Sequence, residues 1–109
     1  MSYKTTTTSR FEREAKKLLK KYPSLKSDLK ELIGQLSENP ALGTPIGKDC
    51  FKIRLAITSK GKGKSGGARV ITFVYFKVET IYLISIYDKS ERDSISDNEI
   101  EDLIKNFNT

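Results

Sequence analysis

The chain has 109 residues, of which 37% are hydrophobic and 31% charged, and this is typical of one globular domain spanning residues 1–109. No apolar run approaches the roughly 18 residues that a membrane span needs, and the first residues contain no apolar stretch typical of a signal peptide. We therefore expect a cytoplasmic protein without a signal peptide and without a membrane partner. The net charge is +6; the single cysteine excludes an internal disulfide, and the lack of histidine excludes imidazole-based catalytic pairs.

The first forty residues predict one strand and two helices. Residues 3–8 are rich in threonine and favour a strand. Residues 9–22 carry an apolar stripe at helical spacing, with a capping-box serine, Ser9, at the start and a proline after the end. Residues 24–39 form a second amphipathic pattern that Ser24 can cap. The short link between the two predicts an antiparallel helical hairpin.

The middle of the chain predicts three consecutive strands. Residues 41–47 contain the glycine and proline typical of a loop. Apolar and polar residues then alternate over residues 51–58, which indicates a half-buried strand. Residues 70–76 and 81–87 are β-branched and aromatic, with a turn at residues 77–80. Local connections of this kind predict an antiparallel meander.

The last element is a helix. Residues 88–95 are polar and loop-like, and Ser96 with Glu99 forms a second capping box ahead of an apolar stripe that ends at Phe107. The predicted order is therefore β-α-α-β-β-β-α. The expected fold class is α+β, in which a small antiparallel sheet made of the N-terminal strand and the meander is packed by the helical hairpin and followed by a C-terminal helix.

The positive charge is concentrated in one segment. Residues 48–69 hold seven basic side chains and one acidic side chain, a net charge of +6, while the other 13 basic and 13 acidic residues cancel. Such a local excess attracts polyanions. A solubilising cluster on a loop is the alternative interpretation.

Three cations of this segment are expected on one face of the sheet. Lys52 and Arg54 are two residues apart on a strand and so project from the same face. Arg69 begins the next strand, and antiparallel pairing brings it beside them. Cations gathered without acidic partners favour a bound anion, and arginine matches the geometry of phosphate oxygens.

The loop between these strands, residues 59–67, alternates lysine with glycine and is called the Lys/Gly loop. Glycines let backbone amides approach a phosphate chain closely. The loop is therefore expected to contact phosphates, with its lysines as the charged partners: Lys60, Lys62 and Lys64. The loop is not a nucleotide-binding P-loop, since the first glycine of that motif is missing and a strand follows. A flexible hairpin tip kept soluble by lysines is the structural alternative.

Residues after the last strand are weaker candidates. Lys89 and Arg92 can reach the same surface, and Tyr87 can stack on a base, although a core role is the more ordinary one for such a tyrosine. Cys50 is interpreted as a buried filler. The acidic residues of this region do not form a recognisable metal site, and we interpret them as ion-pair partners of nearby lysines; they are Asp88, Glu91 and Asp93.

The order of elements and three motifs together resemble the RelE/ParE toxin superfamily over nearly the whole chain. The motifs are the strand Asp-Cys-Phe-Lys-Ile-Arg-Leu at residues 49–55, the strand start Gly-Ala-Arg-Val-Ile at 67–71, and Ile-Ser-Ile-Tyr at 84–87 followed by Asp-Lys-Ser-Glu-Arg. The Lys/Gly loop is similar to that of the HigB-type branch, so the resemblance is closest to the RelE/HigB-like mRNA interferases.

The resemblance implies a toxin of a type II toxin–antitoxin pair that cleaves mRNA in the ribosomal A site. No metal or other cofactor is implied, because the RNA 2′-hydroxyl attacks the adjacent phosphate and leaves a 2′,3′-cyclic phosphate. By motif position, Lys52 becomes a general base or phosphate ligand, Arg54 a phosphate clamp and Arg69 a stabiliser of the transition state. The implied partners are a cognate antitoxin and mRNA on the ribosome.

The chain departs from the family pattern at two positions. Ser90 stands where RelE has a further arginine after the last strand, and Ser96 lies near the place of the family's late tyrosine. The general acid is therefore unassigned. Two alternatives remain open: a ParE-like toxin that inhibits DNA gyrase, and a catalytically inactive relic that binds RNA or its partner.

Overall fold

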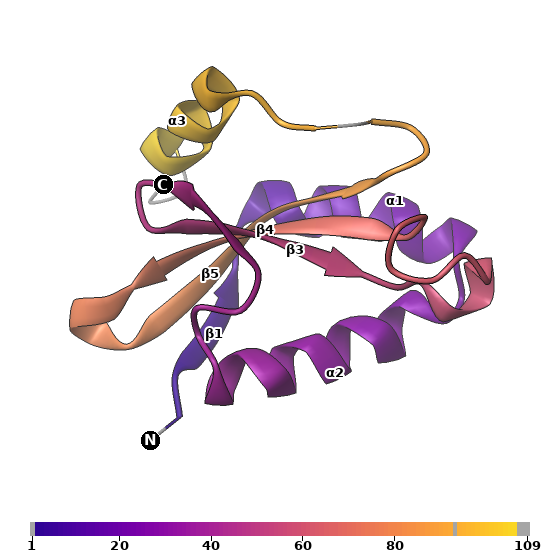
Figure 1. Ribbon diagram of the computed structural model, residues 1–109, viewed down its shortest axis with the longest axis horizontal. Helices are drawn as coiled ribbons and strands as arrows, with labels where there is room; N and C mark the ends of the chain where they lie inside the picture. Colours follow the sequence, from indigo (N-terminus) through magenta and orange to yellow (C-terminus); the bar gives the residue numbers. More distant parts are fainter. Residues whose placement is uncertain (1, 93, 107–109) are drawn as a thin grey trace.

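The computed structural model describes residues 2–92 and 94–106 (Figure 1). Its order of elements confirms the predicted α+β pattern, with one strand more than expected. None of the helices in the described part of the chain is long and apolar enough to cross a membrane. The elements are β1 (Lys4–Thr7), α1 (Ser9–Lys21), α2 (Leu25–Glu38), β2 (Thr44–Gly47), β3 (Cys50–Leu55), a 3-10 turn (Thr58–Lys60), β4 (Ala68–Tyr75), a second 3-10 turn (Phe76–Val78), β5 (Thr80–Asp88) and α3 (Asp97–Asn106).

The five strands form one mixed sheet in the order β1-β5-β4-β3-β2. Strands β3, β4 and β5 make the predicted antiparallel meander. β1 instead runs parallel to β5, with Lys4 opposite Thr80, so the expectation of a wholly antiparallel sheet was wrong at this strand. The residue pattern of a strand does not show whether the strand pairs parallel or antiparallel when its partner lies at the far end of the chain, because no local turn fixes the pairing.

The extra strand, β2, lies within the segment that was predicted to be a loop. It pairs antiparallel with β3 through a two-residue turn in which Lys48 and Asp49 both have positive φ angles, 55° and 61°. Pro45 is tolerated because β2 is an edge strand. The pairing ends where Thr44 meets Lys52, so the second half of β3 has no strand on its outer side.

The sheet has an apolar core on each face. Helices α1 and α2 pack on one face, and α3 packs on the opposite face, as the arrangement of the helices in Figure 1 shows. The first core includes Phe11, Leu18, Leu25, Leu32, Leu36, Ile53, Val70, Val74, Leu83 and Ile86. The second includes Cys50, Ile71, Ile84, Tyr87, Ile100 and Leu103. Phe107, the predicted end of the last apolar stripe, lies outside the described residues.

The helix starts differ in part from the predicted caps. α1 begins at Ser9 as expected, but its cap is Thr8, whose hydroxyl accepts a hydrogen bond from the N–H of Phe11 at 3.2 Å. The hydroxyl of Ser24 does not cap α2 and instead donates to Asp28. The cap of α3 is confirmed, because the N–H of Glu99 donates to the Ser96 hydroxyl at 3.2 Å.

Candidate functional site

Strand β3 places two of the predicted cations on the same face of the sheet. Its odd residues, such as Ile53, enter the core under α1 and α2, so Lys52 and Arg54 point to the α3 side. Arg54 pairs across the sheet with Arg69 of β4, which in turn is opposite Tyr87 of β5. The predicted row of side chains therefore exists in the register of the sheet.

A groove of about 480 Å³ follows the outer edge of β3, where β2 no longer covers it. Residues from both faces of β3 line it, and α2 and the Lys/Gly loop form its other walls. We call this the β3-edge groove. Its lining comprises Asp28, Glu31, Leu32, Gln35, Leu42, Gly43, Thr44, Lys52, Ile53, Arg54, Leu55, Ala56, Thr58 and Lys64.

The groove brings together three of the predicted phosphate-binding cations. Lys52 is half-buried, while Arg54 and Lys64 are exposed. Lys62 is also exposed in the same loop, although it does not line the groove. No ion pair engages any of these four side chains within residues 2–92 and 94–106. They consequently form a positive surface that is open to an anionic ligand.

Arg69 is positioned differently from Lys52 and Arg54, the other two cations that were predicted on this face. Its side chain is buried, with 4% of the residue exposed, and its guanidinium donates to three backbone carbonyls. These are the oxygens of Lys64 at 2.9 Å, Ala68 at 3.1 Å and Ser65 at 3.3 Å. In this conformation Arg69 organises the end of the Lys/Gly loop and does not present its charge to solvent.

Lys60 is likewise turned inward. Its ammonium lies 2.6 Å from Oδ1 of Asp88, and both side chains are almost fully buried. Asp88 also accepts hydrogen bonds from the Tyr22 hydroxyl at 2.7 Å and from the backbone and hydroxyl of Ser90. Burial alone would raise the pKa of Asp88, but the hydrogen bonds from Lys60, Tyr22 and Ser90 lower it well below its ordinary value. One carboxylate thus joins α1, the Lys/Gly loop and the turn after β5.

The other end of the 3-10 turn is fixed to α2. Asp28 accepts from the N–H and the hydroxyl of Thr58, at 3.0 and 2.7 Å, and from the hydroxyl of Ser24. Burial acts to raise the pKa of Asp28, and these hydrogen bonds outweigh it and lower the pKa. The N–H of Ser59 donates to Ser24 at 2.8 Å. Together with Arg69 and Asp88, these bonds hold the Lys/Gly loop at both of its ends.

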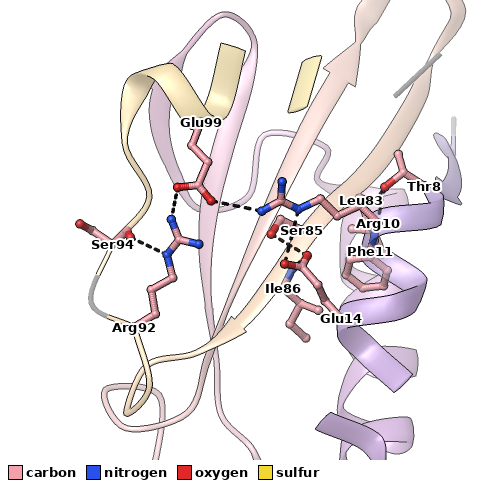
Figure 2. A network of polar contacts seen from close by, with 10 residues as sticks. All are labelled: Thr8, Arg10, Phe11, Glu14, Leu83, Ser85, Ile86, Arg92, Ser94 and Glu99. Carbon is pink, nitrogen blue, oxygen red and sulfur yellow. Dashed lines mark hydrogen bonds and ion pairs between the residues drawn. The ribbon is translucent and has the colours of Figure 1, made fainter. Parts of the chain in front are cut away.

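Arg92 belongs to a network that links α1 to α3 (Figure 2), and Tyr87 lies next to Arg92. Arg92 pairs with Glu99 of α3, and the hydrogen bond between them raises the pKa of Arg92 and lowers that of Glu99. Arg10 of α1 reaches the same carboxylate at 3.1 Å. Tyr87 is 7% exposed and lies beneath α3, with the Arg92 guanidinium 5.5 Å from its ring centre. This placement agrees with the core interpretation of Tyr87.

The remaining candidates add little to the groove. Lys89 is half-buried, and its N–H donates to the carbonyl of Gly67 at 3.0 Å, which ties the turn after β5 to the loop. Cys50 is buried, and burial together with Asp49 raises the pKa of its thiol to about 11. Among the described residues, no three His, Cys, Asp or Glu side chains come close enough to hold a metal ion.

Sequence reasoning identified the cations but missed most of their partners. The ion-pair interpretation was correct for Asp88, which binds Lys60, and for Glu91, which binds Lys21 at 3.6 Å, while Asp93 lies outside the described residues. Glu31 and Gln35 of the groove wall were not singled out. Their spacing of four residues on α2 was the available signal, since it places both on one helix face.

The chain was compared with known families and solved structures. A sequence model of the family described as RelE toxin of the RelE/RelB toxin–antitoxin system matches residues 3–108. A double arginine-to-alanine variant of the E. coli toxin RelE, solved in the free state, has a similar fold with a TM-score of 0.63 and 20% sequence identity. The match covers 96% of this chain and 97% of that chain. The protein therefore belongs to the RelE family and is a toxin of a toxin–antitoxin system.

Proposed function

We propose that this toxin is a ribosome-dependent endoribonuclease of the cytoplasm that cleaves mRNA in the A site and is held inactive by a cognate antitoxin. The observation that supports this most directly is the β3-edge groove, where Lys52, Arg54 and Lys64 gather without an ion-pair partner in the part of the chain that the structure describes. RNA carries the phosphates that such a surface attracts, and membership of the RelE family makes mRNA the preferred polyanion.

In the proposed reaction the 2′-oxygen of the RNA forms a bond to the adjacent phosphorus, and the bond from phosphorus to the 5′-oxygen breaks. Arg54 binds the phosphate oxygens with its planar guanidinium. Lys52, on the same face, accepts the 2′-hydroxyl proton in its neutral form or binds the phosphate when charged. A proton is delivered to the departing 5′-oxygen by a group that is not assigned to a residue of this chain.

Arg69 reaches a phosphate in this scheme only after its guanidinium releases the carbonyls of Lys64 and Ser65. Arg92 is similarly engaged by Glu99, and Ser90, at the position of a family arginine, is bound to Asp88. These three observations favour a second candidate function, a toxin relic that binds RNA without cutting it.

The test is primer extension on a translated message after brief induction. We expect wild type to produce new 5′ ends within codons and Arg54→Ala to reduce them about 100-fold, the usual loss when one transition-state donor is removed. Arg69→Ala should also strongly reduce cleavage, with its folding checked by circular dichroism. Lys26→Ala removes an exposed cation of α2 outside the groove and is the matched control.

Cleavage products, growth arrest and RNA binding together distinguish the candidate functions. Purified toxin with programmed ribosomes should leave a 2′,3′-cyclic phosphate at the 3′ end of the upstream fragment. Growth arrest without new 5′ ends would refute the nuclease proposal and direct the work to DNA gyrase. Salt-sensitive RNA binding with neither arrest nor cleavage would identify the inactive relic.

A further inference from the structure

The wall of the β3-edge groove that faces the cations is chemically different from them. It is formed by one face of α2, on which Asp28, Glu31 and Gln35 follow each other at helical spacing. Asp28 is occupied by Thr58 and Ser24. The side chains of Glu31 and Gln35 are exposed and make no hydrogen bond or ion pair to the described residues. The groove is therefore positive on its β3 side and acceptor-rich on its α2 side.

The dimensions of the groove suit one nucleotide. Its volume of about 480 Å³ is in the range of small-molecule sites. Gly43 closes one end, because its positive φ of 102° and close approach to the Lys52 carbonyl, 2.6 Å from where a Cβ would stand, bring the loop after α2 directly onto β3. An unstacked base is recognised by hydrogen bonds to its edge, while its phosphate is held by cations.

Resting on the function proposed above, we infer that the groove receives one nucleotide of the mRNA and that Glu31, supported by Gln35, determines which base is accepted. Arg54 and Lys64 hold the phosphate on the β3 side, and the base points to α2. An ionised carboxylate only accepts hydrogen bonds. Adenine, cytosine and guanine each offer an amino group to it. Uracil offers one N–H that lies between two carbonyl oxygens, and the negative carboxylate repels these two oxygens.

The structure thus assigns to Glu31 a discrimination against uracil at one position of the codon. Replacing the carboxylate by an amide should remove this discrimination, because an amide can also donate to a uracil carbonyl. A correctly placed hydrogen-bonding side chain discriminates between bases by about tenfold or more. Glu31 is exposed, so the substitution is not expected to disturb the fold.

The experiment measures single-turnover cleavage on ribosomes programmed with messages that carry each base at each A-site codon position. Wild type is expected to cleave uracil-containing codons about tenfold more slowly at one position. Glu31→Gln should reduce this ratio to about twofold, measured between uracil and the other bases within the same variant. Glu38→Gln removes the same charge from α2 outside the groove lining and should retain the wild-type profile.

An unchanged uracil ratio in Glu31→Gln overturns the inference and leaves the nuclease proposal intact; this is also the result expected if the groove holds a segment of a partner protein. A wild type with no uracil bias at any position overturns it as well. Absence of cleavage by wild type refutes the proposed function and this inference together, and it is distinguishable from both of those results.

Discussion

At the scale of single residues, the same side-chain type has opposite roles within one basic segment. Lys52, Arg54 and Lys64 present their charge to a groove, whereas Lys60 and Arg69 use it internally. A buried cation needs a partner, because removing it from water is unfavourable. Lys60 has Asp88, and Arg69 has the loop carbonyls. The inward cations hold the loop that carries Lys64, one of the outward ones.

Asp88 is expected to be the most sensitive of these positions. Asp88→Asn leaves Lys60 buried without its counter-charge and should reduce the free energy of unfolding near pH 7 by about 3 kcal/mol. In a cycle with Lys60→Met, urea unfolding should show strong coupling between the two positions. Simple additivity of the two losses would contradict the ion pair described here.

The lowered pKa of Asp88 also predicts the direction of the pH dependence. Folded protein binds the Asp88 proton less readily than unfolded protein does, so the stabilisation is complete above the ordinary aspartate pKa of about 4 and is lost as the pH falls below it. Wild type should therefore lose stability in acid more steeply than Asp88→Asn does. Unfolding midpoints measured at several pH values between about 5 and 2 test this; parallel curves would show that Asp88 is not the responsible group.

At the scale of elements, α3 is attached to the rest of the fold by a small apolar contact and by charge. Ile100 and Leu103 bury against the sheet, and Glu99 joins Arg92 and Arg10 (Figure 2). Glu14, which pairs with Arg10 at 3.5 Å, also accepts from the Ser85 hydroxyl and the Ile86 N–H at the edge of β5. The network thus connects α1 and α3 with the second half of β5, beyond Leu83, where the pairing with β1 ends.

We expect Glu99→Gln to loosen α3 without unfolding the sheet. The partners are partly exposed, so the loss is limited to about 0.5–1 kcal/mol. Hydrogen exchange should become faster for the amides of α3 and remain unchanged for β4. Glu91→Gln, which breaks an exposed pair with Lys21 away from α3, is the control. Equal exchange in both variants would show that the ion pairs do not hold the helix.

At the scale of the whole molecule, the net charge of +6 resides in one segment, residues 48–69, which contributes β3, the Lys/Gly loop and the start of β4. RNA binding should therefore depend strongly on salt. The slope of log affinity against log salt is negative, and the double variant Lys62→Ala with Lys64→Ala should make it less steep by about 1.4. Each phosphate contact with a single strand contributes about 0.7 to the steepness. Lys16→Ala with Lys17→Ala, two exposed positions of α1, should leave it unchanged. Equal slopes for the two pairs would contradict a localised RNA surface.

The sequence by itself determined the order of all the elements except β2, the meander and the basic segment, because each depends on local patterns such as the alternation in β3 or the capping box at Ser96. It also placed Lys52 and Arg54 on one face, since side chains alternate along any strand. The family resemblance depended on the same local motifs.

Only the tertiary structure decided the direction of β1, the existence of β2 and the fate of Lys60 and Arg69. Each depends on a partner distant in the sequence or on the shape of a loop. Asp88 is 28 residues from Lys60, and no periodicity connects them. The β3-edge groove arises in the same way, because it exists only where β2 stops short of the end of β3 and α2 packs alongside.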